Sequence, residues 1–543
     1  MEDNTDAFLN SLSGNQLDIG QLDIGQLDIG QLDIDRLTSF DVPGIANPAN
    51  GPDIKLDISN DYNDPDDPDD PGNPDDISDY MPDIPNDPDD ISEHALTIQS
   101  VLVGVPDEWR NVMDLDLLEG VLEKIRPDMH VLAPDPPMIF EAFRYFLPLH
   151  TKIVILGQDP YPTPGHAMGL AFSTFGQVPM SLANVYSALI ESKLMRQNEC
   201  ASGDLRSWAG QGILMINKAL TTIHNTSNAH AIHWGKFTDA LLESLCEMWQ
   251  ANGRRVIFLL WGRSAQEAEP TAVKYGHIVF KRPHPSPNSD NRLLTGDRFK
   301  YCTHFTDANR ILKEMNDVPI VWDPLAQTIA FTDGSCIANG TDKADASFAV
   351  FIAKGPVGGT IIVGRVEPYR YKFKDASNPA AGFVADYDSA ALRPSNNRGE
   401  YLAWCWCLYT MLRAHCIGAS VVYSDCKLFI STIKEWLPKR RAAGAASYKK
   451  ELENFDLIQI ADTYYQMLKD VSGREVLMVH TNSAHGRAKP EDKKELAIWL
   501  GNDKVDRLAK SHLVMRQAPW AAGASLDYNI TFQTYSPIVG TLI

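Results

Sequence analysis

The sequence has few cysteines, and none stands in a metal-binding arrangement. Its eight cysteines among 543 residues form no C-x-x-C pair and have no His at zinc-ligand spacing, which predicts free thiols and argues against a structural zinc site. No apolar run reaches the roughly 18 to 20 residues of a membrane span, and the start lacks a basic and apolar leader. We therefore expect a soluble intracellular protein of the cytoplasm, or of the nucleus in a eukaryotic host, with no membrane partner.

Positive charge is scarce at the start of the chain. Residues 1–95 contain 25 of the 71 acidic residues and only two basic ones, Arg36 and Lys55, a net charge of −23. Residues 96–543 therefore carry +1 of the formal −22. The acidic total does not exclude a nucleic-acid partner for this near-neutral part of the chain.

Residues 1–95 are repetitive and poor in apolar side chains. The pentapeptide QLDIG occurs at 16–20, 21–25 and 26–30, QLDI follows at 31–34, and an Asp/Pro-rich run covers 64–71. Such a composition buries too little apolar surface to fold, so we predict a disordered acidic tail. The repeat resembles the QL(S/D)LF-type peptides by which bacterial replication proteins dock on a sliding clamp, although Gly follows Ile in three copies. A solubilising tail is the alternative interpretation.

Apolar runs of strand length alternate with helix-length stretches from about Leu96 onward, which predicts a parallel α/β domain over 96–317. A Pro-containing linker over 318–327 precedes a second α/β domain over 328–516, and a poorly patterned tail covers 517–543. The runs of the first domain are at 152–156, 213–217, 256–261 and 277–280, and those of the second include strands at 328–332 and 420–424 and a helix from Arg398 to about Ala414.

Polar and aromatic side chains follow three strands of the first domain. The turn after KIVIL carries Asp159 and Tyr161, ILMIN ends in Asn217, and HIVFKRP leads to His284. Ligands of open α/β sheets bind beyond the carboxyl ends of the strands, so we expect these side chains and Phe172 to share one pocket. That set suits a flipped base, which is recognised by stacking and by hydrogen bonds to its edge.

Five strings in this region, GQDPY, GLAFS, the strand ending in Asn217, LLWG and HPSP, occur in the order typical of the uracil-DNA glycosylase family. Residues 100–316 therefore resemble that family, which needs no cofactor and acts on uracil-containing DNA. The resemblance implies that Asp159 stabilises the cationic sugar and orients water, and that His284 donates a hydrogen bond to uracil O2. It further implies uracil binding by Gln158, Tyr161, Phe172 and Asn217, and DNA contacts by Ser181, Ser286 and Asn288.

Three positions depart from the family pattern. Pro162 stands where many members have His, and Arg263 replaces the usual Ser after LLWG, either as a phosphate contact or as a solvated charge. Asn288 occupies the position of a Leu that wedges into the base stack. An amide fills less apolar space, so we expect weaker base extrusion from duplex DNA than from single strands.

The second domain contains acidic residues on separate expected elements. Asp333 lies mid-strand in TIAFTDGSC, Glu400 begins a helix, Asp425 ends the strand SVVYSD, and Asp506 lies in GNDKVDRLA. A buried carboxylate is costly unless it binds something, and clustered acids are typical of sites for paired divalent cations.

The strings TDGSC, NNRGE, SD and GNDKVDRLA resemble those of the ribonuclease H family over about residues 326–515. The resemblance implies metal-dependent cleavage of the RNA strand of RNA–DNA hybrids. Two Mg²⁺ ions, or Mn²⁺ as the alternative, are expected to be held by Asp333, Glu400, Asp425 and Asp506. It implies that His485 assists proton transfer or product release, with His480 as the alternative, and that the hybrid is bound by Cys336, Asn339, Asn396 and Asn397.

The stretch from Tyr369 to Ser395 exceeds what the family pattern needs and is interpreted as an insertion. Its basic residues alternate with aromatic ones, either as a hybrid-binding ridge or as an edge strand with a solvated basic face. For the whole chain two hypotheses compete: a monomeric bifunctional DNA-maintenance enzyme, or a non-catalytic DNA-binding or replication-tethering protein that retains these folds. Only an enzyme needs Asp159, His284 and four carboxylates together.

Overall fold

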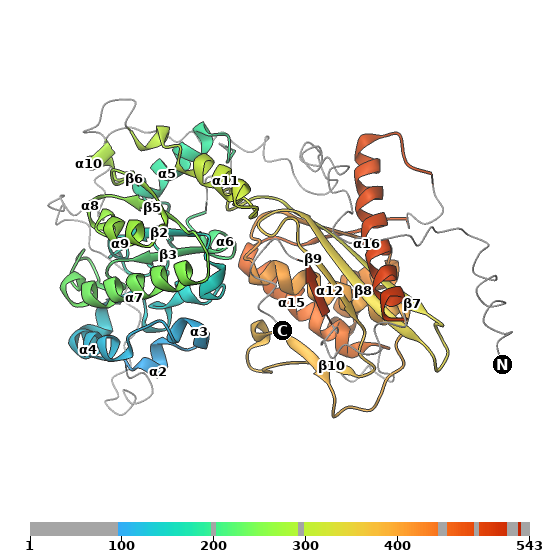
Figure 1. The fold of residues 1–543 in the computed structure, drawn as a ribbon. Helices are drawn as coiled ribbons and strands as arrows, with labels where there is room; N and C mark the ends of the chain where they lie inside the picture. The colour runs from blue at the N-terminus through green and yellow to red at the C-terminus, as the bar shows by residue number, and fades with distance from the viewer. Residues whose placement is uncertain are drawn as a thin grey trace.

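The structure is a computed structural model that describes residues 96–196, 202–290, 298–443, 453–482, 488–517 and 530–533. Figure 1 shows two α/β domains, one coloured blue to green and the other yellow to red. We call them the middle domain, from residue 96, and the C-terminal domain, from residue 328. The acidic segment 1–95, and with it the clamp hypothesis, lies outside the described residues.

Four parallel strands form the main sheet of the middle domain, in the order β3-β2-β5-β6. They are β2 (Ile153–Gly157), β3 (Ile213–Asn217), β5 (Ile257–Trp261) and β6 (Ile278–Arg282). Every residue of the first three strands is buried, as in parallel strands covered on both faces, which explains their continuous apolar sequences. The predicted parallel α/β sheet is therefore confirmed.

The helices of the middle domain are short except for α4, α5, α7 and α11. Asp114 caps the start of α4 by accepting a hydrogen bond from the amide of Leu117. The helices are α2 (Ile98–Val101), α3 (Asp107–Arg110), α4 (Leu115–Ile125), α5 (Met180–Glu191), α6 (Arg206–Ala209), α7 (Ala231–Ala251), α8 (Arg263–Gln266), α9 (Glu269–Lys274), α10 (Pro287–Asp290) and α11 (His304–Glu314). Two short strands, β1 (Leu132–Ala133) and β4 (Thr222–Ile223), form a separate pair.

The C-terminal domain is built on a mixed sheet in the order β13-β12-β7-β8-β9-β14. Strands β7, β8 and β9 are antiparallel neighbours, whereas β12 and β13 run parallel to β7. Their bounds are β7 (Thr328–Ile337), β8 (Asp345–Lys354), β9 (Ile361–Arg365), β12 (Ser420–Ser424) and β13 (Leu477–His480).

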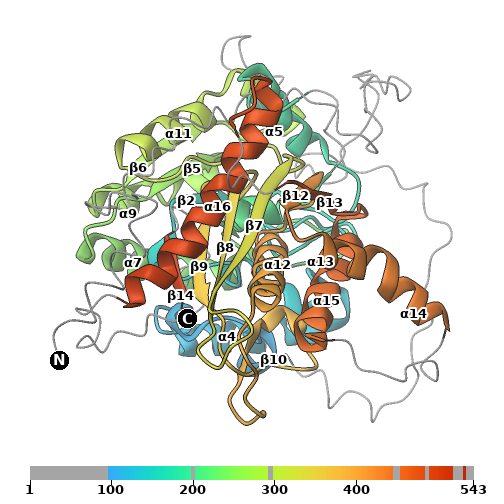
Figure 2. The ribbon, with the colours of Figure 1, turned by 90° about the vertical axis from the view of Figure 1, so that its right-hand side faces the viewer.

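Helices cover both faces of this sheet. Ala330 of β7 packs with α12 (Asn396–Arg413) and α15 (Phe455–Ser472), whereas its neighbour Phe331 packs with α16 (Lys493–Gln517). Figure 2 shows α16 crossing the sheet. The alternation of side chains along each strand thus separates two apolar cores. The remaining helices are α13 (Lys427–Ser431) and α14 (Leu437–Ala443).

The predicted insertion folds as a hairpin of β10 (Arg370–Phe373) and β11 (Phe383–Asp386). Tyr371 packs against Phe383 and Phe373 against Tyr464, with ring centroids 6.2 Å and 5.8 Å apart. The basic side chains between these aromatics are exposed. This alternation favours the strand with a solvated basic face over an aromatic ridge that binds nucleic acid.

Two segments outside the predicted domains have regular structure or packing. Residues Ile530–Gln533 of the C-terminal tail form β14, which pairs antiparallel with β9, so the expectation of an unpatterned tail is wrong there. Its β-branched and aromatic residues suit a strand that completes an otherwise open sheet edge. In the linker, Ile320 and Trp322 pack into the core of the middle domain, and Trp208 Nε1 donates a hydrogen bond to the carbonyl of Trp322 (2.8 Å).

The described part of the chain contains no helix that is long and apolar enough to span a membrane. The cysteines within it are free thiols, as the sequence predicts, and most are buried.

We predict that Gly501→Ala destabilises the C-terminal domain by about 1–3 kcal/mol, because the added methyl overpacks its core. A Cβ at Gly501 of α16 would lie 2.2 Å from Cζ of the buried Phe331. Urea unfolding combined with amide hydrogen exchange measures the effect, and faster exchange should be confined to β7 and its neighbours. Gly120→Ala on α4 is the control, because nothing lies within 4 Å of its added Cβ. Equal stability of the two variants would contradict this packing argument.

Candidate active sites

A cavity of about 410 Å³ opens at the carboxyl ends of the middle-domain strands. The sequence placed several separate motifs at this edge, and the structure brings them together. The predicted residues that line the cavity are Gln158, Asp159, Tyr161, Phe172, Ser181, Asn217, His284 and Ser286.

The position of the Asn217 side-chain amide depends on the glycine beside it. Gly157 and Asn217 are paired across β2 and β3, and a Cβ on Gly157 would lie only 2.0 Å from Asn217 Oδ1. No larger residue fits at 157 without displacing the amide. The side chain of Asn217 is buried at the cavity wall, so its polar edge is available to a ligand rather than to bulk water.

The Asp159 carboxylate is held through one of its oxygens. Oδ2 accepts hydrogen bonds from the Asn228 amide (2.6 Å) and the Ser227 hydroxyl (2.7 Å), whereas Oδ1 has a long contact of 3.5 Å with Gln158 Nε2. Burial raises the pKa of Asp159, and these hydrogen bonds to the charged form oppose the rise.

Ser227 and Asn228 were not identified from the sequence. They follow β4 in the stretch HNTSN, where Asn225 and Asn228 have positive φ angles of 57° and 60°. Asparagine tolerates this conformation better than most residues, so the two asparagines signal a tight turn. The sequence gives no sign that the turn faces Asp159, which precedes it by nearly seventy residues.

The His284 imidazole is neutral at neutral pH. Burial lowers its pKa to about 4. Its Nδ1 accepts a hydrogen bond from the Ser286 amide (3.1 Å), which assigns the proton of the neutral ring to Nε2. Asn184 of α5 steadies the same loop, because its Nδ2 donates to the Pro285 carbonyl (2.7 Å). His284 therefore offers the cavity a hydrogen-bond donor without a positive charge.

Phe172 forms an aromatic wall of the cavity. Its ring centroid lies 5.3 Å from that of Trp261 and 5.8 Å from that of His284. Its backbone has a φ of 64°, a left-handed conformation that costs a residue with a Cβ roughly 1–2 kcal/mol. The surrounding contacts must supply that energy.

Tyr161 is fixed across the cavity from two sides. Its hydroxyl donates to the Phe172 carbonyl and lies 3.3 Å from Ser181 Oγ. Ser286 Oγ contacts Ser289 Oγ at 3.4 Å. Ser181 and Ser286 are both buried, so their hydroxyls face the cavity from within the protein.

Of the three departures from the family pattern, Pro162 and Arg263 line the cavity. Arg263 begins α8 and lines the cavity with an exposed side chain, without a hydrogen bond or ion pair to any residue that the structure describes. Asn288 lies in α10, but its side chain is outside the described part of the structure.

Three predicted carboxylates of the C-terminal domain converge. Asp333, Glu400 and Asp425 each place one oxygen within 4.8 Å of the others. Asp333 and Glu400 are buried, and burial together with the charges of neighbouring carboxylates raises the pKa of both well above the usual range. Glu400 Oε2 is buried without a hydrogen-bond partner among the described residues. A buried acceptor in an acidic cluster suits a divalent cation.

Two glycines allow this convergence. A Cβ on Gly334 of β7 would lie 2.3 Å from the Glu400 amide, and one on Gly399 of α12 would lie 2.5 Å from the Ser347 carbonyl. The absence of both side chains lets α12 approach the sheet closely. Ser395 caps this helix by accepting a hydrogen bond from the Arg398 amide, which fixes where Glu400 emerges.

Asp506 lies near the cluster but outside its tight core. Its charge raises the pKa of Asp333 and of Asp425, although burial is the main cause in both, and its Oδ1 forms an ion pair with Lys510 (2.7 Å). His480 lowers the pKa of Asp425 and is paired with Ser424 in the sheet, so this alternative to His485 lies beside the site. His485 itself is outside the described residues.

The predicted hybrid-binding residues are placed differently. Asn339 and Asn397 are exposed and line a second cavity of about 800 Å³, whereas Cys336 and Asn396 are half-buried. Asn396 Nδ2 contacts Glu400 Oε1 at 3.5 Å, so Asn396 lies next to the carboxylates. None of the clustered carboxylates lines the second cavity.

Comparison with known proteins identifies the middle domain. The model of the uracil DNA glycosylase superfamily matches residues 143–313. The uracil-DNA glycosylase of Agathobacter rectalis is 39% identical over 198 residues, 36% of this chain and 83% of that protein, and that of Yersinia pestis is 40% identical over 36% and 82%. The crystal structure of mimivirus uracil-DNA glycosylase is 32% identical, with a TM-score of 0.37 over 42% of this chain and 88% of the other. Through its middle domain, this chain belongs to the uracil-DNA glycosylase family.

Proposed function

We propose that the chain is a bifunctional enzyme that excises uracil from DNA in the middle domain and cleaves the RNA of RNA–DNA hybrids in the C-terminal domain. The first activity is supported by family membership and by a cavity that joins Asp159, Asn217 and His284. The second is supported by the cluster of Asp333, Glu400 and Asp425 and by the sequence resemblance to ribonuclease H. The carboxylate cluster is the observation on which the second activity depends.

In uracil excision the bond between the sugar C1′ and uracil N1 breaks, and the sugar becomes cationic. The ionised Asp159 stabilises that cation. Because Ser227 and Asn228 occupy Oδ2, Oδ1 is left to orient the attacking water and to accept its proton. Protonation of Asp159 removes both contributions, so uracil release falls as the pH falls through the raised pKa of this residue.

The departing uracil carries negative charge on O2. The Nε2–H of neutral His284 donates a hydrogen bond to that oxygen, an interaction that strengthens as the charge develops. A neutral donor does not require the ring to be protonated, which agrees with the lowered pKa of His284.

Base selection follows from the other cavity residues. Asn217 reads the N3 and O4 edge of uracil, which cytosine presents with donor and acceptor reversed. Phe172 stacks on the base, and Tyr161 fills the space that a thymine methyl group needs. Gln158 contributes main-chain contacts, and Ser181 and Ser286 contact the DNA phosphates.

In hybrid cleavage Asp333, Glu400, Asp425 and Asp506 would hold Mg²⁺, which would supply Lewis-acid stabilisation of the oxygens in a phosphoryl displacement. The orphaned Glu400 Oε2 and the repulsion among the buried carboxylates fit such cations. His485, or His480 beside Asp425, assists proton transfer.

Nucleic-acid contacts extend from this cluster along the domain surface. Asn339 and Asn397 line the second cavity and can address the 2′-hydroxyl of RNA. Trp436 is 42% exposed, and Lys434 and Lys439 beside it are exposed as well. An exposed aromatic among cations is typical of surfaces that stack bases and bind phosphates. A non-catalytic scaffold would need such a surface but not the buried carboxylates.

Combining Asp159→Asn with His284→Leu should lower uracil release by at least about a thousandfold, because charge stabilisation is lost at both the sugar and the base. Hybrid cleavage should be unchanged. Release of uracil from a labelled single strand and cleavage of a labelled hybrid measure the two activities, each with and without EDTA. EDTA should stop only hybrid cleavage.

The matched control is Asp116→Asn with His130→Leu, since both residues are exposed and lie outside the cavity. Both activities should survive in this variant. Loss of hybrid cleavage together with uracil release in the Asp159/His284 variant would contradict two separate sites.

His284 should remain neutral until the pH falls to about 4, because burial lowers its imidazole pKa to that value. NMR titration of the ¹⁵N-labelled imidazoles checks this, with the His284 signals assigned by their absence from the His284→Leu spectrum. A midpoint near the ordinary His value of roughly 6.5 would refute the neutral-donor mechanism.

Asp333→Asn should lower hybrid cleavage by at least about a hundredfold and weaken Mg²⁺ binding, because it removes a central ligand. Calorimetric titration with Mg²⁺ and the labelled hybrid assay measure the two effects. Asp470→Asn, at an exposed position of α15, is the control and should behave as the wild type. Unchanged Mg²⁺-dependent cleavage in Asp333→Asn would place the metal site elsewhere.

A further inference from the structure

The turn that ends α12 carries a strained histidine at the surface between the domains. His415 has a φ of 45°, and its amide donates to the Leu412 carbonyl (3.1 Å) while the next amide, of Cys416, donates to Met411 (3.0 Å). This position after a helix normally favours glycine. The His415 ring lies 5.7 Å from the ring of Tyr145 in the middle domain. The aromatic contact gives a reason for a side chain where glycine would be less strained.

The backbones of the two domains also touch at this turn. A Cβ on Gly210, which follows α6, would lie 3.1 Å from the Ala414 carbonyl oxygen and 3.2 Å from its Cα. Arg413 Nη2 donates to the Arg144 carbonyl (3.3 Å). The α12 turn is therefore seated directly against the middle domain.

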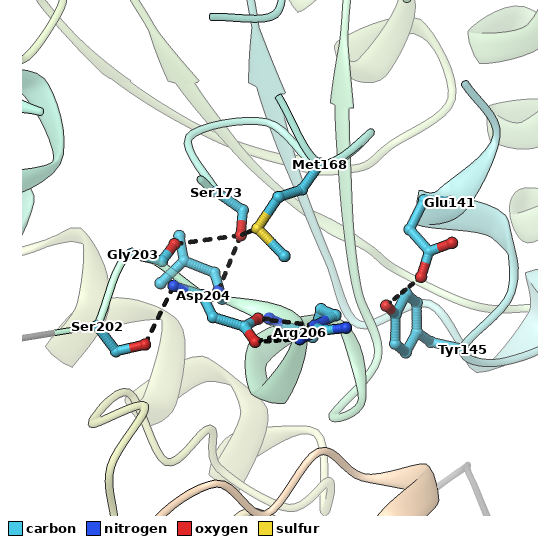
Figure 3. Close-up of polar contacts among 9 residues, drawn as sticks. Glu141, Tyr145, Met168, Ser173, Ser202, Gly203, Asp204 and Arg206 are labelled. Atoms are coloured by element: carbon cyan, nitrogen blue, oxygen red, sulfur yellow. Dashed lines mark hydrogen bonds and ion pairs between the residues drawn. The ribbon is translucent and has the colours of Figure 1, made fainter. Parts of the chain in front are cut away.

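Figure 3 shows a polar cluster of the middle domain that consists of two separate pairs, Tyr145 with Glu141 and Arg206 with Asp204. The charges of Arg206 and Asp204 act on the pKa of Tyr145 in opposite directions, so the two pairs lie near each other. Tyr145 donates a hydrogen bond to Glu141, and Arg206 Nε and Nη2 form an ion pair with the Asp204 carboxylate, the shortest contact being 2.6 Å. Burial lowers the pKa of His415 to about 4, and the Arg206 charge lowers it too, so the ring meets this cluster uncharged. The ring contributes packing, and its Nδ1 is buried without a partner among the described residues.

The segment that carries Asp204 and Arg206 holds the cavity wall. Ser173 Oγ accepts from the Leu205 amide (2.9 Å) and donates to the Gly203 carbonyl (3.2 Å), which also accepts from the Thr174 amide (2.9 Å). Ser173 directly follows Phe172, the residue with the left-handed backbone. Figure 3 shows Ser173 between Met168, another cavity residue, and the Gly203–Asp204 segment.

We propose that the C-terminal domain positions the uracil-binding wall of the glycosylase, with His415 as a positioning residue that acts through Tyr145 and the Gly203–Arg206 segment on Phe172. This role deepens the proposed uracil excision and rests on it. The C-terminal domain thereby serves the middle domain independently of its own chemistry. Every residue that lines the glycosylase cavity belongs to the middle domain, so the C-terminal domain contributes position and no lining group.

His415→Gly in the full chain should raise KM for a uracil-containing single strand, and the inhibition constant of free uracil, by about threefold to tenfold, with kcat nearly unchanged. The reason is that stacking on Phe172 contributes to ground state and transition state alike. Glycine suits the turn, so the C-terminal domain should keep its melting temperature. His415→Phe should restore wild-type values, because the ring and not the nitrogen makes the contact.

Two glycine substitutions test the same contact from the other side. Gly210→Ala should raise KM because its methyl pushes against Ala414, whereas Gly120→Ala, with nothing near its added Cβ, should not. Lys193→Gly, at another left-handed residue, controls for added glycine. Hydrogen exchange should quicken at 203–206 and 170–175 in His415→Gly and in Gly210→Ala. Wild-type kinetics and exchange in both variants would overturn the positioning role, whereas a wild-type chain that releases no uracil would overturn the proposed function itself.

Discussion

Burying a carboxylate is costly, and both active sites are organised around that cost. In the middle domain the charge of Asp159 is stabilised by hydrogen bonds from Ser227 and Asn228, so the acid stays useful without a cation. In the C-terminal domain Asp333 and Glu400 have few donors and are repelled by neighbouring carboxylates, so the site is suited to an external cation. The same physical constraint therefore has two different solutions within one chain: hydrogen-bond donors in the middle domain and, in our proposal, a cation in the C-terminal domain.

The elements that carry the sites were predictable because they obey strong local rules. Continuous apolar runs predicted β2, β3 and β5, and the rule that ligands lie at strand ends placed Asp159 and Asn217 together. The clustering of Asp333, Glu400 and Asp425 was also expected from their motifs, and the structure brings these three together. Asp506 was predicted to join them, and in the structure it forms an ion pair with Lys510.

Features that depend on distant contacts were not predictable. Nothing in HNTSN reveals that Ser227 and Asn228 face Asp159, and the pairing of β14 with β9 joins strands that lie far apart in the sequence. The sequence of the 369–395 insertion is compatible with a hybrid-binding ridge and with an edge strand that has a solvated basic face. Only the packing of Tyr371 and Phe373 shows which side chains face inward. The ring contact between His415 and Tyr145 joins residues of different domains and leaves no periodic pattern in the sequence.

The anchoring of Trp322 has a mechanical consequence for how the two domains move. Because residues up to Trp322 belong to the middle-domain core, only 323–327 remain to reach β7, and Asp323 Oδ1 accepts from the Leu325 amide within that stretch (2.9 Å). A span this short limits how far either domain can swing. If both proposed activities are present, a uracil and a ribonucleotide on the same strand would be reached one after the other, by moving the whole protein.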